Sequence, residues 1–386
     1  MRSKLPGVGT TIFTIMSNMA QDYQAINLSQ GFPDFDCPPR LRELVSQYLN
    51  NNKNQYAPMA GIPELREQIA TKVKTLYHLT ANPETEITVT SGATEALFDA
   101  IQAVVHPGDE VIVFDPAYDS YEPAITMAAG LTIHIPLRQP DYSVDWQLVK
   151  DRINAKTRLI IINTPHNPTG AILSAADMET LAALLHDTAI YVLADEVYEH
   201  MVFDGEQHQS VLRFPELAAR SFAVFSFGKT YHTTGWKLAY CVAPPGLTAE
   251  LRKIHQYVTF TSTSFLQYAI ADFLHQCPQY ALGLPGFYQQ KRDYFSQLLR
   301  ATPFQLIPSH GTYFQLADYS AISDLPDHEF CNKLTQEIGV AAIPLSPFYQ
   351  HPPSTRHIRF CFCKDDSTLK QATERLTKIY APESTG

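Results

Sequence analysis

The chain contains the segment Ser226-Phe227-Gly228-Lys229-Thr230-Tyr231-His232-Thr233-Thr234-Gly235-Trp236-Lys237, which directly follows an apolar run at 222–225. A short apolar run of this kind is typical of a buried strand, so residues 226–229 are predicted to lie where that strand ends. One hydroxyl and two lysines therefore meet at one turn. A lysine amine forms Schiff bases with carbonyl compounds, and Ser226 together with Lys237 offers groups that bind a phosphate. The alternative is an ordinary strand end with solvated lysines.

From residue 86 onward, apolar runs alternate with segments of helical spacing. We predict strands at 86–90, 110–114, 158–163, 189–194, 221–225 and 238–242. Helical segments such as 94–105 and 175–186 separate most of them. This alternation predicts a mainly parallel sheet that is covered by helices on both faces. In such sheets, ligands bind beyond the carboxyl ends of the strands.

Polar residues follow the first two of these strands. Ser91-Gly92-Ala93-Thr94 opens a helix, so its backbone N–H groups and the helix dipole form a phosphate seat. Ser91 or Thr94 also suits the role of a plain helix cap. Tyr118 follows the strand at 110–114, where its ring either stacks on a planar ligand or lies in a surface loop.

The next two strands are also followed by polar side chains. Asn167 begins the sequence Asn-Pro-Thr-Gly at 167–170, which is a turn signal, but its amide would point into the same crevice. Asp195 follows the strand at 189–194, and Tyr198 comes three residues later. Because an unpaired buried carboxylate is costly, Asp195 either caps a helix or meets a cation such as a protonated pyridine nitrogen.

The chain ends have a different pattern. Gly31 lies in a Gly/Pro turn, where the missing Cβ would also let a ligand carboxylate approach closely. Beyond about residue 290, strands predicted at 311–316, 340–345 and 357–363 and helices at 327–338 and 367–380 favour a smaller α+β unit. Arg359 interrupts the apolar pattern of the last predicted strand. Its charged side chain either reaches solvent or binds an anion such as a carboxylate.

Composition excludes several classes of function. The chain has 386 residues, of which 45% are hydrophobic and 18% charged, enough for two or three globular domains. A net charge of −10 without a basic cluster argues against nucleic acid as a partner. No stretch approaches the roughly 18 apolar residues of a membrane span, and a signal peptide is not expected. Six scattered cysteines without a C-x-x-C pair predict no metal site and a reduced, cytoplasmic location.

The motifs in their order resemble one enzyme family. They are Asn-Pro-Thr-Gly at 167–170, Asp-Glu-Val-Tyr at 195–198, Ser-Phe-Gly-Lys at 226–229 and Gly-Trp-Lys at 235–237. Nearly from end to end, the chain resembles the fold-type I aminotransferases of class I/II, which depend on pyridoxal 5'-phosphate (PLP). The methionine aminotransferase, kynurenine aminotransferase and glutamine transaminase branch is the most similar. The resemblance implies an α/β fold with a large PLP-binding domain at 47–289 and a small α+β domain formed by 1–46 and 290–386.

The resemblance also implies a role for each candidate residue. Lys229 would carry PLP as a Schiff base and later move the substrate proton, Asp195 would pair with the pyridine nitrogen, and Tyr198 would bond the phenolic oxygen. Arg359 would bind the substrate carboxylate. The other cofactor contacts would come from Gly92, Ala93, Thr94, Tyr118, Asn167, Ser226 and Lys237, and from Tyr56 of the other subunit of a homodimer. The other substrate contacts would come from Gly31, Asn167, Phe13 and Phe260.

The implied reaction is a ping-pong transfer of an amino group from a large neutral L-amino acid to a 2-oxo acid. Methionine and aromatic amino acids are the expected donors, with glutamine and kynurenine as further candidates, because the pocket candidates include no second arginine for a side-chain carboxylate. Thr94 stands where some relatives carry an aromatic residue, and Thr261 replaces a histidine. Both departures leave the individual substrate open.

Two other functions are compatible with parts of this pattern. A PLP-dependent β-lyase of the cysteine S-conjugate type, or a related synthase, would use the same site, because loss of a β-substituent competes with reprotonation. A non-catalytic PLP-binding regulator would normally carry a DNA-binding segment. We expect none here, since the matched motifs already begin at Asn27.

Overall fold

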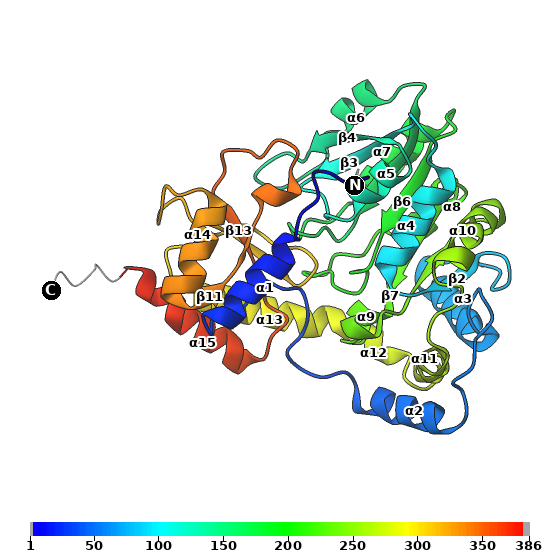
Figure 1. Ribbon diagram of the computed structural model, residues 1–386, viewed down its shortest axis with the longest axis horizontal. Helices are drawn as coiled ribbons and strands as arrows, with labels where there is room; N and C mark the ends of the chain where they lie inside the picture. Colours follow the sequence, from blue (N-terminus) through cyan, green and yellow to red (C-terminus); the bar gives the residue numbers. More distant parts are fainter. Residues whose placement is uncertain (1–2, 381–386) are drawn as a thin grey trace.

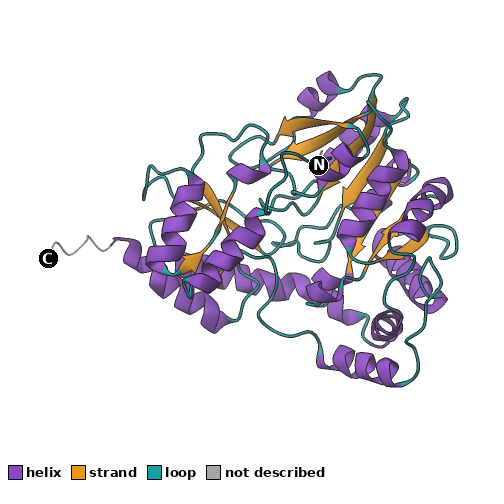
Figure 2. Ribbon diagram, in the orientation of Figure 1, coloured by secondary structure: helices purple, strands orange, loops and turns teal. Residues whose placement is uncertain are grey.

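The computed structural model describes residues 3–380 and contains two parts, each built on a sheet of its own (Figures 1 and 2). The larger part holds a seven-stranded sheet in the order β2-β8-β7-β6-β5-β3-β4. Its strands are β2 (Ile87–Thr90), β3 (Glu110–Asp115), β4 (Leu131–Pro136), β5 (Thr157–Asn163), β6 (Tyr191–Asp195), β7 (Ser221–Ser226) and β8 (Ala239–Val242). All neighbours are parallel except β8, which is antiparallel to both β2 and β7. The prediction of a mainly parallel sheet is therefore confirmed.

Each face of this sheet packs into its own hydrophobic core. On β6, Val192 and Ala194 belong to one core, whereas Leu193 between them belongs to the other. Helices α3 (Pro63–Tyr77) and α7 (Ala175–Leu185) contribute to the first core, and α4 (Ala93–Val104), α5 (Tyr121–Met127) and α10 (Pro245–Val258) contribute to the second. Because both faces are covered, the central strands consist almost entirely of apolar residues.

The smaller part holds a four-stranded antiparallel sheet in the order β12-β13-β10-β9. Its strands are β9 (Gln305–Leu306), β10 (Phe314–Asp318), β12 (Ile343–Pro344) and β13 (His357–Cys361). A separate parallel pair joins β1 (Ile26–Asn27) to β11 (Val340–Ala341), so the segment at 12–27 lies against the C-terminal region (Figure 1). The strand predicted at 340–345 is therefore two short strands that pair with different partners.

The remaining helices complete the chain. They are α1 (Ile12–Asp22), α2 (Pro39–Asn50), α6 (Trp146–Arg152), α8 (Pro215–Ala218), α9 (Phe227–Thr230), α11 (Ser264–Gln276), α12 (Gln279–Leu282), α13 (Leu284–Leu299), α14 (Asp327–Lys333) and α15 (Asp366–Leu376). None of the described helices combines the length and the apolar character that crossing a bilayer requires. The domain boundaries at 46/47 and 289/290 stay predictions, and residues 1–2 and 381–386 of the predicted small domain lie outside the described part.

Candidate active site

A cavity of about 310 Å³ lies at the carboxyl ends of the parallel strands, between the two parts of the chain. Strands β5, β6 and β7 each deliver a polar residue to it, as expected for a doubly covered parallel sheet. Most of the site residues predicted from the sequence line this cavity. They are Phe13, Gly31, Gly92, Ala93, Thr94, Tyr118, Asn167, Asp195, Tyr198, Ser226, Lys229, Lys237 and Arg359. Residues from distant positions in the sequence thus meet in one place.

Lys229 lies in the single turn of α9 that follows β7. The hydroxyl of Ser226 caps this turn by accepting a hydrogen bond from the backbone N–H of Lys229 at 3.3 Å. The amine of Lys229 donates to the carbonyl oxygen of Gly31 at 3.1 Å and to the hydroxyl of Tyr313 at 2.8 Å. Burial lowers the pKa of the Lys229 amine to about 8. About one tenth of this amine is therefore uncharged and nucleophilic at pH 7, far more than for a lysine with an ordinary pKa.

Asp195 ends strand β6 and is buried. Its Oδ2 accepts a hydrogen bond from the hydroxyl of Tyr121 at 2.7 Å. Burial raises the pKa of the Asp195 carboxyl to about 6, against the opposing hydrogen bond from Tyr121. Among the described residues, no Lys, Arg or His forms an ion pair with Asp195. A buried carboxylate in this position suits a ligand that brings its own positive charge.

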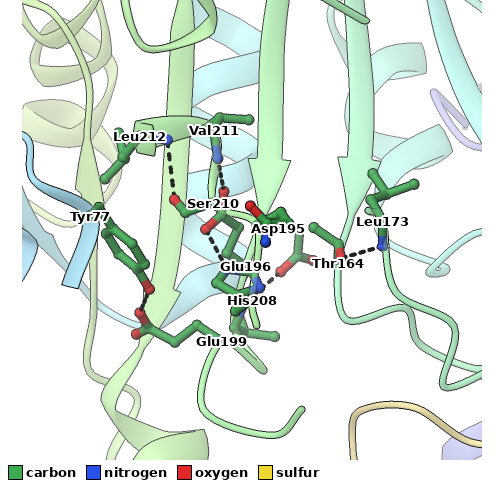
Figure 3. Close-up of polar contacts among 12 residues, drawn as sticks. Tyr77, Thr164, Leu173, Asp195, Glu196, Glu199, His208, Ser210, Val211 and Leu212 are labelled. Atoms are coloured by element: carbon green, nitrogen blue, oxygen red, sulfur yellow. Dashed lines mark hydrogen bonds and ion pairs between the residues drawn. The ribbon is translucent and has the colours of Figure 1, made fainter. Parts of the chain in front are cut away.

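Two buried glutamates hold the segment that carries Asp195 and Tyr198 (Figure 3). Glu196 accepts from Nε2 of His208 at 2.8 Å and from the backbone N–H of Val211 at 2.9 Å. Glu199 accepts from the hydroxyl of Tyr77, as drawn in Figure 3, and from the amine of Lys72. These hydrogen bonds and the ion pair of Glu199 with Lys72 anchor the segment on both sides of Tyr198.

Arg359 projects from β13 and is only 1% exposed. Its Nη1 donates to Oδ1 of Asn167 at 2.7 Å, and its Nη2 donates to the carbonyl oxygen of Ser29 at 2.8 Å. The guanidinium carbon lies 3.8 Å from the centroid of the Phe314 ring, and the buried Nε has no hydrogen-bond partner. No described carboxylate pairs with this guanidinium, so it can bind an anion that enters the cavity.

The start of α4 forms a seat for a second anion. Gly92 is the N-cap with φ of 89°, and no side chain caps the first N–H groups of the helix. This φ lies in the left-handed region that favours glycine, and a Cβ added there would lie 3.0 Å from Cε and 3.1 Å from Nζ of Lys237. Free N–H groups, a helix dipole and a lysine amine together suit a phosphate.

Tyr56 and Phe260 do not line the cavity. Tyr56 is 84% exposed and Phe260 is 44% exposed, and their rings meet edge to face with centroids 5.6 Å apart. The structure of one chain therefore places this pair on the surface. The expectation that Tyr56 reaches the site of a second subunit stays a prediction. Phe260 was expected to contact the substrate, but it does not line the cavity of its own chain.

Sequence reasoning missed two tyrosines that bond the key groups. Tyr313 contacts the Lys229 amine, and Tyr121 contacts Asp195. Both are buried, and in the sequence they look like ordinary core aromatics. Glu196 and Glu199 were also not singled out, although two acidic residues beside an apolar strand require buried partners.

Comparison with known proteins identifies the family. Residues 23–376 match the family described as aminotransferase class I and II. The chain is 52% identical over 378 residues to methionine aminotransferase of Escherichia coli (strain K12), with 98% of each chain covered. It is 32% identical to kynurenine–oxoglutarate transaminase 1 of Rattus norvegicus, with 97% of each covered. The crystal structure of YbdL from Escherichia coli, which is associated with a methionine aminotransferase function, matches with a TM-score of 0.96 at 52% identity, covering 98% of this chain and 99% of that chain.

Enzymes of this family and fold use pyridoxal 5'-phosphate. The residues described above fit that group on three independent counts. Among the described residues, the half-buried Lys229 has an amine without an acidic partner, Asp195 has a buried carboxylate without a cation, and Gly92 opens a helix without a side-chain cap beside a lysine. The chain belongs to the class I and II aminotransferases, and it is a PLP-dependent aminotransferase.

Proposed function

We propose that this enzyme transfers the amino group of a large neutral L-amino acid to a 2-oxo acid by a ping-pong mechanism. Methionine and aromatic amino acids are the proposed donors, with glutamine and kynurenine as further candidates. The observation that carries the proposal is the make-up of one cavity: it contains the Lys229 amine, the Arg359 guanidinium and no other arginine among its described lining residues. The names of the Escherichia coli and rat relatives support the same class of substrate.

We propose the following contacts with PLP. Lys229 holds it covalently, Asp195 pairs with its ring nitrogen, and Tyr198 and Asn167 hydrogen-bond its phenolic oxygen. The ring of Tyr118 stacks on it, and the phosphate binds at Gly92, Ala93, Thr94, Ser226 and Lys237. When bound, PLP supplies an electron sink for the electron pair of the substrate Cα–H bond.

The residues of the chain then perform four tasks. Arg359, with Asn167 and the backbone of Gly31, fixes the substrate carboxylate by paired, charge-assisted hydrogen bonds. The Lys229 amine, whose pKa of about 8 suits a base at neutral pH, removes the Cα proton and later returns it. Asp195 keeps a proton on the nitrogen that it faces, because the anion stabilises the cation in a buried site. Phe13 provides apolar surface at the cavity wall for the substrate side chain.

We further propose a homodimer in which Tyr56 of each subunit reaches the phosphate of the other site. The exposed pair Tyr56 and Phe260 supports this, because large aromatic side chains are rarely left open to solvent in a cluster without a partner. Tyr257 and Val258, at the end of α10, are exposed beside the same loop. The six free cysteines support a cytoplasmic location.

The lyase alternative receives no support from the relatives. The Escherichia coli and rat relatives are named for transamination and not for β-elimination. An assay that separates 2-oxo acid plus aminated acceptor from pyruvate plus ammonia distinguishes the two reactions directly.

Substrate choice gives a first prediction. Methionine is expected to react at least about tenfold faster than aspartate under equal conditions, because aspartate would bring a second carboxylate into a cavity with a single guanidinium. A panel of amino donors and 2-oxo acids with purified enzyme measures this ratio. Turnover of aspartate at least about tenfold faster than methionine would show the proposed substrate class to be wrong.

Arg359→Lys gives a second prediction. Lysine keeps the charge but loses the planar pair of donors, so KM for both amino acid and 2-oxo acid should rise about 10- to 100-fold while kcat changes less. Steady-state kinetics with two amino donors measures the changes in KM and kcat separately. Arg220→Lys is the matched control, because Arg220 also donates to several carbonyl oxygens but lies outside the cavity. Unchanged KM values in Arg359→Lys would remove Arg359 from the carboxylate site.

The pKa of Lys229 gives a third prediction. The neutral amine is the reacting form, so the rate at which apoenzyme takes up pyridoxal should rise about tenfold per pH unit and level off above a pH of about 8. An ordinary lysine would continue to accelerate to a pH of about 10. Stopped-flow absorbance, recorded over this pH range, measures the pH at which the uptake rate is half of its maximum. A rate that still rises steeply at a pH of about 9 would contradict the lowered pKa.

A further inference from the structure

A buried group of three ionisable side chains lies next to the proposed phosphate seat but outside the cavity. Glu95 is in the first turn of α4, Asp99 follows one turn later, and His255 on α10 faces both. None of the three lines the cavity, and the side chains of His255 and Asp99 are fully buried. The proposed reaction uses none of these groups, so their charges call for a separate explanation.

Both ring nitrogens of His255 face hydrogen-bond acceptors. Nδ1 lies 2.7 Å from Oε1 of Glu95, and Nε2 lies 2.9 Å from the carbonyl oxygen of Met59. A carbonyl oxygen never donates, and the second oxygen of Glu95 accepts from the backbone N–H of Ser91. A neutral imidazole has a single N–H, so an imidazolium is the form that satisfies both contacts to an ionised Glu95.

The surroundings favour the same charge state. Burial by itself lowers the pKa of His255, but the hydrogen bond and the negative charge of Glu95 outweigh burial, and the pKa lies above its ordinary value. For Glu95, burial raises the pKa, yet the hydrogen bonds that it accepts bring it below the ordinary value. Burial and repulsion by Glu95 raise the pKa of Asp99 to about 7. Glu95 and Asp99, both from α4, are the charged groups that act on His255 within the described chain.

The same side chains do not suit a metal ion, although their oxygen and nitrogen atoms lie close together. A histidine ligand needs a free lone pair on one ring nitrogen, and both nitrogens of His255 are engaged as donors. Neither buried oxygen of Asp99 has a hydrogen-bond partner within residues 3–380, and its Oδ2 lies 3.7 Å from Nδ1 of His255. Its nearest counter-charge is therefore the imidazolium.

Glu95 holds the phosphate seat in place, but its negative charge opposes the binding of a phosphate there. Its carboxylate holds the backbone N–H of Ser91, directly before the N-cap Gly92. A bare carboxylate in the first turn of α4 would repel an anion bound at that turn, and little solvent is present to screen it. The imidazolium of His255 offsets this charge and leaves the hydrogen bond to Ser91 in place.

His255 also connects the seat to the surface that carries the exposed aromatic pair. The Met59 carbonyl that it binds lies three residues after Tyr56, and its own carbonyl oxygen accepts from the backbone N–H of Phe260 at 3.0 Å. One buried residue thus touches the phosphate-binding turn and both segments that bear Tyr56 and Phe260.

We propose that His255 is a positioning residue, held as an imidazolium, that neutralises Glu95 so that the first turn of α4 accepts a phosphate dianion. The proposal rests on the phosphate seat proposed above. It predicts that His255 affects ligands that carry a phosphate and has little effect on those that lack one, because its action is electrostatic.

The charge state is tested on unmodified holoenzyme. Histidine ring nitrogens are labelled with ¹⁵N, and the signals of His255 are assigned by their absence in His255→Gln. At a pH of about 8, one unit or more above the pKa of an ordinary histidine, both nitrogens of His255 should still carry protons. A ring with a single proton under these conditions would overturn the proposal.

The phosphate dependence is tested with apoenzyme of His255→Gln. Its Kd for PLP should rise about tenfold, while its Kd for pyridoxal, which lacks the phosphate, should change less than about twofold. His275→Gln, an exposed histidine on α11, is the matched control and should change neither. Equal weakening of both ligands would indicate a merely structural role and overturn the proposal. If wild-type enzyme bound no PLP, the proposed function itself would fail instead.

Discussion

Lys229→Ala is expected to lower transamination by at least about 1,000-fold and to abolish the visible absorbance of bound PLP. In the proposed mechanism, the variant loses both the covalent link to the cofactor and the base that moves the Cα proton, and general base catalysis alone contributes about 100- to 10,000-fold. The structure offers no substitute at that position, because Lys229 is the amine that donates to both Gly31 and Tyr313. Absorbance spectra and single-turnover kinetics with methionine measure the two losses.

The matched control for this experiment is Lys253→Ala. Lys253 is an exposed lysine on α10 that pairs with Glu250 and lies outside the cavity. The visible absorbance of bound PLP and the transamination rate should both remain at wild-type levels in Lys253→Ala. Retention of absorbance and transamination in Lys229→Ala would contradict the assignment of Lys229.

Asp195→Asn is expected to lower kcat about 100- to 1,000-fold while PLP remains bound. The substitution keeps the shape and the contact with Tyr121 but removes the buried negative charge, and loss of one partner from a buried ion pair costs about 3–5 kcal/mol. The ring nitrogen would then lose its proton, and the electron sink would weaken. Rapid-scan absorbance during a half-reaction with methionine separates the chemical step from binding.

Asp115→Asn is the matched control for Asp195→Asn. Asp115 is also a buried aspartate at the end of a parallel strand, but it contacts His134 and the backbone N–H of Gln350 outside the cavity. Its substitution should reduce stability and leave kcat of the folded enzyme unchanged. A kcat for Asp195→Asn within about twofold of wild type would mean that the ring nitrogen does not depend on this carboxylate.

Much of the large sheet was predictable because its central strands are buried on both faces. Runs such as 221–225 contain no charged residue, so their strand character is visible without any partner. Strand β4 was not predicted, because it is an edge strand whose residues are mostly half-exposed and include Thr132 and His134. Helix α1 was not predicted either, although Phe13 within it was expected at the substrate site.

Pairing partners were less predictable than strands. Residues 340–345 form one apolar run, yet Val340 pairs with Ile26 whereas Ile343 pairs with Arg359. Nothing within the run marks the change of partner at Ala342, because that choice depends on two distant segments of the chain. Sheet membership in the small part is therefore a property of the tertiary structure.

The site followed from topology where residues lie at strand ends. Asn167, Asp195 and Lys229 were found because parallel strands bring their carboxyl ends to one edge. Tyr121 and Tyr313 were not found, because a buried tyrosine with a hydrogen bond looks the same in sequence as one that only packs. The exposure of Phe260 could not be anticipated from the sequence of one chain. We propose that this surface contacts the other subunit of a homodimer.

The central claim is that Lys229 carries PLP in the cavity that also holds Asp195 and Arg359. The most direct measurement is borohydride reduction of the holoenzyme, which fixes PLP on the lysine that bears it, followed by proteolysis and mass spectrometry of the labelled peptide. We predict one modified lysine, Lys229, and an unmodified Lys237. Label on Lys237 or on any other lysine, with Lys229 left free, would contradict the account.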